Sequence, residues 1–169
     1  MIQDTCAKII LSFFAVALML IIIAPLAYPY GTFVNLDGSA GIMDHDWGGY
    51  GAGGIVYAIG DMLCHQESAR SFFLNGSQLA FCIRDIGLLS GFVAGFVHVV
   101  WKGIQSYDSK KLATGIGLLI PTAIEYICEH SFDMDLPELR FILGILSGFG
   151  AALILGYALY RNAGQDALL

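Results

Sequence analysis

Four long runs of apolar residues with few charges dominate the pattern of the chain. They cover approximately residues 8–28, 86–101, 112–128 and 139–160. A membrane-spanning α-helix needs about 20 predominantly apolar residues. The pattern therefore predicts an all-α fold, an integral membrane bundle of four transmembrane helices that forms a single membrane domain over residues 1–169.

A fifth apolar stretch, residues 52–63, is too short to cross a membrane. At a helical rise of 1.5 Å per residue it reaches only about 18 Å, whereas the hydrocarbon core is about 30 Å thick. We therefore expect a short re-entrant or interfacial helix here. Residues 31–54, which precede and overlap it, are rich in glycine and aspartate. That composition predicts a flexible connection and no second domain.

Composition and charge exclude several classes of protein. Of the 169 residues, 57% are hydrophobic and only 13% charged, whereas soluble domains carry about 25% charged residues. The chain is therefore neither an ordinary soluble enzyme nor a disordered protein. With 8 Lys and Arg against 14 Asp and Glu, it has no basic surface to neutralise phosphates, which excludes nucleic acid as a partner.

The distribution of basic residues predicts the orientation in the membrane, because cytoplasmic loops carry an excess of Lys and Arg. These residues lie before the first span, between the second and third spans, and after the fourth: Lys8, Lys102, Lys110, Lys111 and Arg161. We therefore expect a multi-pass protein of the cell membrane with both termini in the cytoplasm. Residues 31–85 and the junction of the third and fourth spans then face the extracytoplasmic side.

Small residues in two of the spans predict close helix packing. The segment Gly87-Leu-Leu-Ser-Gly91-Phe in the second span is echoed by Gly144-Ile-Leu-Ser-Gly148-Phe in the fourth. The echo indicates either a duplicated half or independent small-residue packing, and we favour the second, because Gly-xxx-Gly faces let helices approach closely. We expect these two spans in the packed interior. The same faces would also permit self-association or contact with other membrane subunits.

Residues 61–85 carry a dense set of ligand-type side chains in an otherwise apolar chain. Cys64, His65, Cys82 and Asp85 form a possible ligand set for zinc or another transition metal. Cys82 and Asp85 are three residues apart, so one helical turn brings them to the same ion. Cys64 and His65 are adjacent, about 100° apart on a helix, and can both bind only if the helix ends there.

Two other states of these cysteines stay open. Extracytoplasmic cysteines lie in an oxidising compartment, where Cys64 and Cys82 can form a disulfide. The disulfide would close the loop between the two cysteines and stabilise the fold by about 3 kcal/mol in the chain-entropy model. The third possibility is that both are free, buried thiols.

The third span contains two carboxylates four residues apart, Glu125 and Glu129, on one helix face. Carboxylates at this depth must pair, take up a proton or bind a cation. Arg140 is the expected partner, with Arg70 and Arg84 as other candidates. One interpretation is an ion-pair network that fixes the helices. The other is a catalytic site, with Glu125 as general base and the arginines binding an anionic head group.

A set of motifs spread over about residues 50–155 carries a family resemblance. The motifs are Cys64-His65-Gln66-x-x-x-Arg70-Ser71-Phe72, Cys82-x-Arg84 with Gly87, Pro121-x-x-x-Glu125-x-x-x-Glu129, and Leu139-Arg140 with Gly144 and Gly148. In them the chain resembles the domain-of-unknown-function 2085 family of small polytopic membrane proteins of bacteria and archaea. The resemblance implies a shared site on the outer face and implies no particular reaction.

The chain departs from the family pattern at two places. Asp85 stands where a further cysteine is usual, and Glu125 and Glu129 stand where an aspartate and a glutamine are usual. If the family site is a metal centre, Asp85 supplies an oxygen ligand and shifts the preference toward harder cations.

Three functions of different classes follow from these observations. The first is a metal-dependent membrane enzyme that acts on a lipid-like substrate, with zinc or another transition metal at the cysteines. The second is a non-enzymatic protein that binds or transports an ion or small solute. The third is an accessory subunit of a membrane complex, stabilised by a Cys64–Cys82 disulfide. We also expect the outer-half polar residues to converge in one pocket: Cys64, His65, Arg70, Cys82, Arg84, Glu125 and Arg140.

Overall fold

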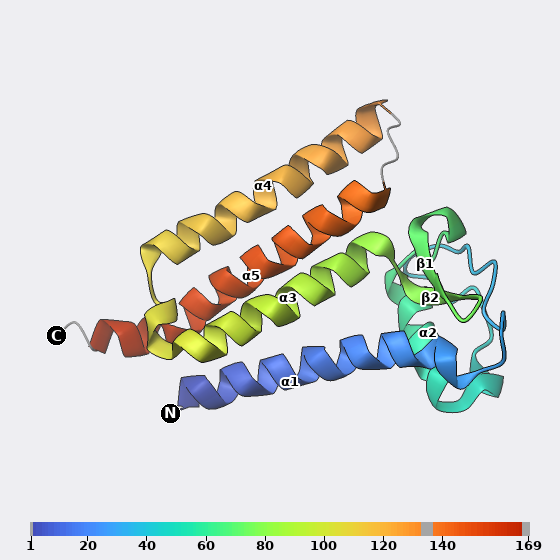
Figure 1. Ribbon diagram of the computed structural model, residues 1–169, viewed down its shortest axis with the longest axis horizontal. Coiled ribbons are helices and arrows are strands. Elements are labelled where there is room, and N and C mark those ends of the chain that lie inside the picture. Colours follow the sequence, from blue (N-terminus) through green and yellow to red (C-terminus); the bar gives the residue numbers. More distant parts are fainter. Residues whose placement is uncertain (1, 133–136, 167–169) are drawn as a thin grey trace. The chain divides into compact units, whose positions relative to one another are not determined.

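The computed structural model describes residues 2–132 and 137–166 and is mainly helical (Figure 1). The helices are α1 (Ile2–Ile23), α2 (Gly51–Leu63), α3 (Ile83–Lys102), α4 (Ser109–Phe132) and α5 (Pro137–Asp166), and the strands are β1 (Ser71–Leu74) and β2 (Ser77–Cys82). Short 3-10 helices are η1 (Ala24–Ala27), η2 (Gly48–Tyr50), η3 (Ser68–Arg70) and η4 (Gly103–Ser106).

Four helical segments are long and apolar enough to cross a membrane, which confirms the predicted fold class. They are Ile2–Ala27, Ile83–Ser106, Ser109–Glu129 and Pro137–Arg161. Most of them extend beyond the predicted apolar runs, because polar residues continue the helices past the hydrophobic stretch. Helix α2 has 13 residues and lies outside these spans, as expected of a helix too short to cross.

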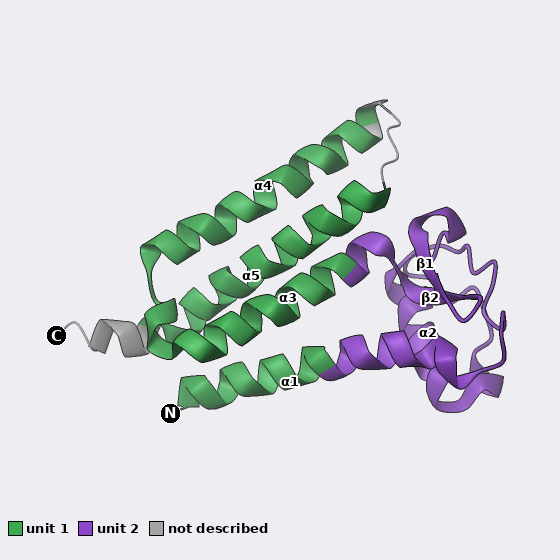
Figure 2. Ribbon diagram, in the orientation of Figure 1, with its two compact units in different colours: residues 1–15, 87–169 green, residues 16–86 purple. Residues whose placement is uncertain are grey.

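The chain forms two compact units, shown in Figure 2. Unit 1 comprises residues 1–15 and 87–169, and unit 2 comprises residues 16–86. The boundaries fall inside α1 and α3, so each of these helices contributes to both units. Each unit has its own hydrophobic core.

In unit 1, helix α5 packs between α3 and α4 (Figure 1). The contact with α3 depends on glycines from the two echoed segments. A Cβ atom at Gly91 would collide with the carbonyl group of Ile145, and one at Gly148 would collide with that of Leu88. The two contacts are reciprocal, because Ile145 directly follows Gly144 in its segment and Leu88 directly follows Gly87 in the other. The expected packing of the second and fourth spans in the interior is thereby confirmed.

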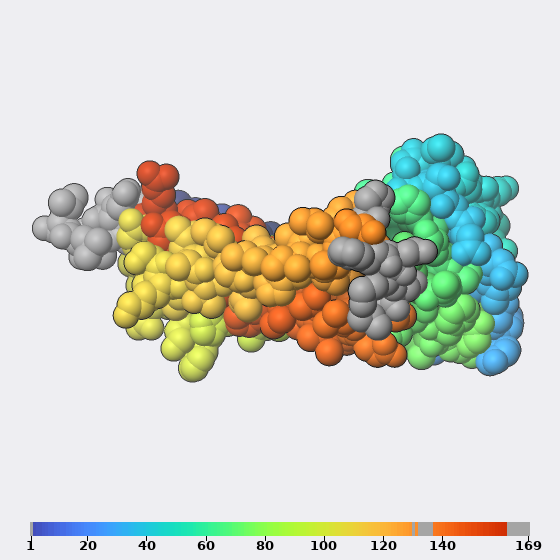
Figure 3. All heavy atoms as spheres, turned by 90° about the horizontal axis from the view of Figure 1, so that it is seen from above, coloured from blue at the N-terminus to red at the C-terminus, as the bar shows by residue number. Residues whose placement is uncertain are grey.

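Helix α4 packs against α5 and covers it on the face seen in Figure 3. Thr122 of α4 donates a hydrogen bond to the carbonyl oxygen of Leu143 in α5 at 2.9 Å, and the hydroxyl of Ser147 donates to Thr122 at 2.6 Å. Most of the α4 surface is exposed within the structure and apolar. Such a surface is typical of a helix that faces lipid, where water would be excluded.

Unit 2 is organised around aromatic side chains that fill the space between α2, η1 and the connecting loop. Phe33 stacks on Tyr57 with 3.9 Å between ring centroids, and Trp47 stacks on Tyr57 at 5.3 Å. Tyr28 and Tyr50 pack against the same group. The glycine-rich loop predicted to be flexible is thus anchored to the core by Phe33 and Trp47.

The hairpin of β1 and β2 adds a small antiparallel sheet that the hydrophobic pattern did not predict. Asn75 and Gly76 form its turn with φ angles of +54° and +66°. An Asn-Gly pair is the strongest short-range signal for such a turn, because both central positions require positive φ. The strands on either side of this turn have only four and six residues, too few to stand out in the hydrophobic pattern.

Candidate metal centre

Cys64 ends helix α2, and a close contact between α2 and β2 determines where it lies. The Cys64 N–H donates to the carbonyl oxygen of Gly60 at 2.8 Å, and the chain then becomes extended. A Cβ atom at Gly60 would collide with the carbonyl oxygen of Ala80 in β2. The glycine therefore lets α2 touch β2, and this contact brings Cys64 toward the end of the hairpin.

Two fully buried glutamines fix the segment that follows Cys64. Gln66, at a φ of +48°, donates from Nε2 to the carbonyl oxygen of Ala80 at 2.9 Å. Gln78 donates from its own Nε2 to the carbonyl oxygen of Gln66 and to Ser71 Oγ, the latter at 3.1 Å. These side chains replace water as partners for buried backbone groups. The segment is thereby held against the hairpin.

Cys82 and Asp85 lie on consecutive elements, since β2 ends at Cys82 and α3 begins with the next residue. The Cys82 thiol donates a hydrogen bond to Asp85 Oδ2 at 3.0 Å. The two Sγ atoms and one Asp85 oxygen all lie within 4.8 Å of one another. Cys64 is buried and the other two are half-buried. We call these three residues the thiol–carboxylate cluster.

Hydrogen bonding makes the two thiols of the cluster unequal. The bond between them lowers the pKa of Cys64 and raises the pKa of Cys82, and burial raises the latter further. All four cysteines of the chain are free thiols in this structure. Cys64 is therefore the member of the pair that loses its proton first. The resulting thiolate is the form of cysteine that binds metals.

The other residues predicted for this region lie differently. The His65 side chain is exposed, and among the described residues it is not part of the group of ligand atoms that come together. Arg70 forms an ion pair with Glu67, with 3.1 Å between Nε and Oε2, and both side chains are partly exposed. Arg84 is half-buried in the first turn of α3.

A second polar group lies in unit 1, where α4 and α5 meet. Arg140 Nη2 is 2.7 Å from Glu129 Oε1, and Arg140 Nε is 3.6 Å from Glu125 Oε1. The Arg140 side chain is only 4% exposed. The expected pairing of Arg140 with both carboxylates is thus confirmed. Its role, structural or catalytic, stays a prediction.

The predicted site residues therefore form two groups on different units. Cys64, Cys82 and Asp85 come together in unit 2, whereas Glu125 and Arg140 come together in unit 1. The convergence of both groups in one pocket stays a prediction.

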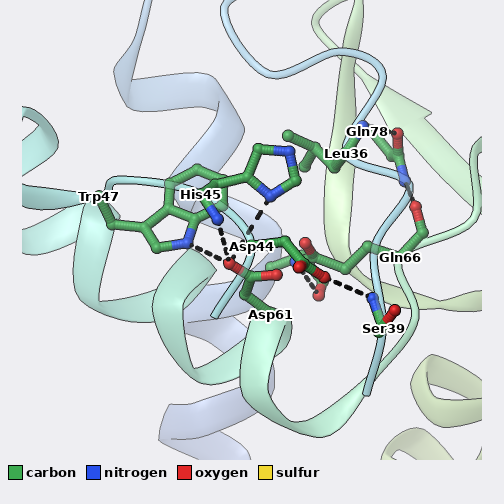
Figure 4. A network of polar contacts seen from close by, with 9 residues as sticks. Leu36, Ser39, Asp44, His45, Trp47, Asp61, Gln66 and Gln78 are labelled. Atoms are coloured by element: carbon green, nitrogen blue, oxygen red, sulfur yellow. Dashed lines mark hydrogen bonds and ion pairs between the residues drawn. The ribbon is translucent and has the colours of Figure 1, made fainter. Parts of the chain in front are cut away.

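Figure 4 shows a buried carboxylate that the sequence pattern did not single out. Asp61, 1% exposed, accepts hydrogen bonds on Oδ2 from Trp47 Nε1 at 2.9 Å and from the His45 N–H at 3.1 Å. His45 Nδ1 lies 3.6 Å from the same oxygen. The loop around His45, part of the connection predicted to be flexible, is therefore tied to α2. The sequence did contain a signal for this buried group, an acidic residue within a short apolar helix. A buried charge there requires hydrogen-bonding partners from elsewhere in the fold.

Comparisons with known proteins agree with the membrane character of the chain. The profile of a family described as "Predicted membrane protein (DUF2085)" matches residues 64–154. The chain is also similar to "Uncharacterized protein MJ1492" of Methanocaldococcus jannaschii, with 33% identity over 102 residues. The matched region covers 56% of this chain and 62% of that relative. No solved structure matches the chain significantly.

Proposed function

The chain belongs to the DUF2085 family of predicted membrane proteins, and we propose that its thiol–carboxylate cluster binds a transition metal of the zinc class. The observation that carries the proposal is the approach of two Sγ atoms and one carboxylate oxygen to within 4.8 Å of one another. Tetrahedral ligands about 2.0–2.3 Å from zinc lie roughly 3.3–3.8 Å apart. The three groups need only small movements to reach that geometry.

The donor set favours zinc over calcium or magnesium. Thiolates are soft ligands that select zinc, copper(I) and iron, whereas calcium and magnesium are bound by oxygen. Three protein ligands leave a fourth position for water or substrate, as in catalytic zinc sites. Zinc in such a site lowers the pKa of its bound water and polarises a bound carbonyl or phosphoryl oxygen.

The place of the cluster in the chain supports a substrate from the membrane surface. Asp85 lies in the first turn of α3, whose apolar span begins at Ile83. The cluster thus lies at the end of a membrane-spanning helix. We propose an enzyme that acts on a lipid-like substrate, with Arg70 or Arg84 of the same unit binding an anionic group.

A second candidate function rests on the state of the same two cysteines. They are free thiols whose Sγ atoms lie within 4.8 Å of each other, so an oxidising compartment can convert them into a structural disulfide. The chain would then be an accessory membrane subunit without a metal.

Cobalt(II) titration of the reduced, detergent-solubilised protein tests the metal site. We expect thiolate-to-cobalt charge-transfer absorption that saturates at one ion per chain and is lost in Cys64→Ser and Cys82→Ser. Asp85→Asn should weaken binding, because it removes the charged oxygen ligand.

His65→Ala is the matched control, since the His65 side chain is exposed and lies outside the cluster. It should leave the cobalt spectrum unchanged, and loss of the spectrum would restore the four-ligand set predicted from the sequence. The proposal is wrong if the reduced protein shows no thiolate–cobalt absorption. Recovery of a Cys64–Cys82 disulfide from protein alkylated before purification would favour the second candidate.

A further inference from the structure

Helix α2 has its polar and apolar sides arranged in the opposite sense to a helix of a water-soluble protein. Its buried residues include Gly60, Asp61 and Tyr57. Its most exposed side chains are aliphatic: Ile55 at 63%, Ile59 at 50%, Met62 at 42% and Leu63 at 68%. A helix on a water-facing surface shows the reverse, with charges outside and aliphatic residues inside.

The exposed aliphatic residues form one stripe along the helix. Ile55, Ile59 and Met62 follow at spacings of four and three residues, which places them on one helical face, with Leu63 at its edge. Asp61 is the only charged residue between Gly51 and Leu63, and it is turned inward to Trp47. The stripe therefore contains no charge.

The loop before α2 extends this apolar surface. The Gly41 N–H donates to the carbonyl oxygen of Met62 at 2.9 Å, which places the loop tip at the end of α2. The next two residues, Ile42 and Met43, are 58% and 53% exposed. We call the six exposed residues from the helix and the loop tip the α2 apolar patch: Ile42, Met43, Ile55, Ile59, Met62 and Leu63.

The connections of unit 2 indicate what covers this patch. The chain enters the unit from a span that ends at Ala27 and leaves it into a span that begins at Ile83. The segment between them is therefore tethered to the bilayer surface at both ends. A helix of 13 residues is about 20 Å long, too short to cross the core but suited to lie in the interface.

From the inverted polarity of α2 and this double tether we propose that the α2 apolar patch inserts into the lipid interface. The patch contacts lipids of the outer leaflet at the level between their head groups and acyl chains. Helix α2 is therefore an interfacial helix rather than a re-entrant one. Insertion of the α2 apolar patch does not depend on whether the thiol–carboxylate cluster binds a metal. The patch gives unit 2 a membrane contact of its own.

Tryptophan fluorescence in vesicles of brominated phosphatidylcholine tests the insertion directly. The background variant is Trp101→Phe, which leaves Trp47 as a buried reference. Ile59→Trp places a probe in the patch. Ala69→Trp is the control, because Ala69 is exposed in η3 beside Ser68 and Arg70, which bind Asp37 and Glu67.

We expect the emission of the probe at position 59 to be quenched by bromines near the head-group end of the acyl chains and protected from aqueous acrylamide. The probe at position 69 should show the opposite behaviour. Both positions are exposed, so neither substitution alters the core. Quenching of the position 59 probe by acrylamide would overturn the proposal by showing contact with water. Protection from both quenchers would overturn it as well, because another protein surface would then cover the patch.

Discussion

Single residues decide how unit 2 tolerates polar groups in its core. Tyr57 is fully buried, packs against both Phe33 and Trp47, and donates its hydroxyl hydrogen bond to the carbonyl oxygen of Gln78 at 2.6 Å. Burial raises the pKa of the Tyr57 phenol above its ordinary value of about 10. The neutral phenol is thus the form that the fold accepts.

The raised pKa of Tyr57 predicts a loss of stability at high pH. Below pH 10 the phenol is neutral in both states and its full contribution is present. As the pH rises beyond about 10, the unfolded chain releases the proton more readily than the folded one, so the free energy of unfolding falls. We expect Tyr57→Phe to lower the free energy of unfolding by about 1 kcal/mol at neutral pH, because the hydrogen bond of the hydroxyl is lost. In the variant, unfolding measured between pH 9 and 11 should depend less on pH than in the wild type, and equal slopes would contradict the assignment.

Arg140 is the residue on which the polar group of unit 1 depends. Its replacement by Gln removes a cation that pairs with both Glu125 and Glu129, and breaking a buried ion pair costs about 3–5 kcal/mol. Reversible unfolding in mixed micelles should show a loss of this order. Glu138→Gln, an exposed acid in the same first turn, is the control and should change stability little.

A triple variant completes the test of this pairing. Glu125→Gln, Glu129→Gln and Arg140→Gln together should recover part of the stability lost in Arg140→Gln, because the two carboxylate charges are removed together with the guanidinium that pairs with them. If Arg140→Gln alone is as stable as the wild type, the group has no structural role.

Residue chemistry also explains what the sequence could and could not predict. The pairing of Arg140 with Glu125 was predictable, because charges on apolar spans have few possible partners. The partners of Asp61 were not, because Trp47 and His45 reach it only through the fold of an irregular loop. The Cys64–Cys82–Asp85 grouping was predictable by residue type. The exposure of His65 depends on where α2 ends.

At the scale of elements, α3 and α5 approach closely in unit 1 at Gly91 and Gly148. This contact could be predicted, because glycines such as Gly91 and Gly148 in the two echoed segments let helices approach closely. The hairpin of β1 and β2 could not be recognised from hydrophobic periodicity, since its strands have only four and six residues. Its turn and its glutamine contacts arise from local backbone geometry.

The crossing predicts a strong difference between two glycines. Gly91→Leu should destabilise the protein by about 1–3 kcal/mol or more, because its side chain would collide with the backbone of α5 and force the helices apart. Gly117→Leu is the matched control, since nothing lies within 4 Å of a Cβ atom at Gly117. Thermal unfolding of both variants in one detergent provides the comparison. Equal effects of the two substitutions would contradict the described packing.

At the scale of the whole molecule, the four spans are the most predictable feature because the bilayer fixes their length and composition. The division into two units was not predicted, since it depends on which contacts form along α1 and α3. The loop charges alone predict the orientation, with both termini in the cytoplasm.

Labelling in intact cells tests the orientation. A cysteine introduced by Ser109→Cys should resist a membrane-impermeant thiol reagent until the cells are permeabilised, because the loop charges predict that the start of α4 faces the cytoplasm. Ser39→Cys, exposed in the loop before α2, should be labelled without permeabilisation. The unsubstituted chain gives the background of its native cysteines. The reverse pattern would invert the topology.

Metal analysis of the protein purified in detergent under non-oxidising conditions tests the central claim most directly. The account predicts about one zinc-class ion per chain, retained through gel filtration, absent from Cys82→Ser and retained in His65→Ala. A wild-type protein that contains no stoichiometric metal, with Cys64 and Cys82 joined in a disulfide, would contradict it.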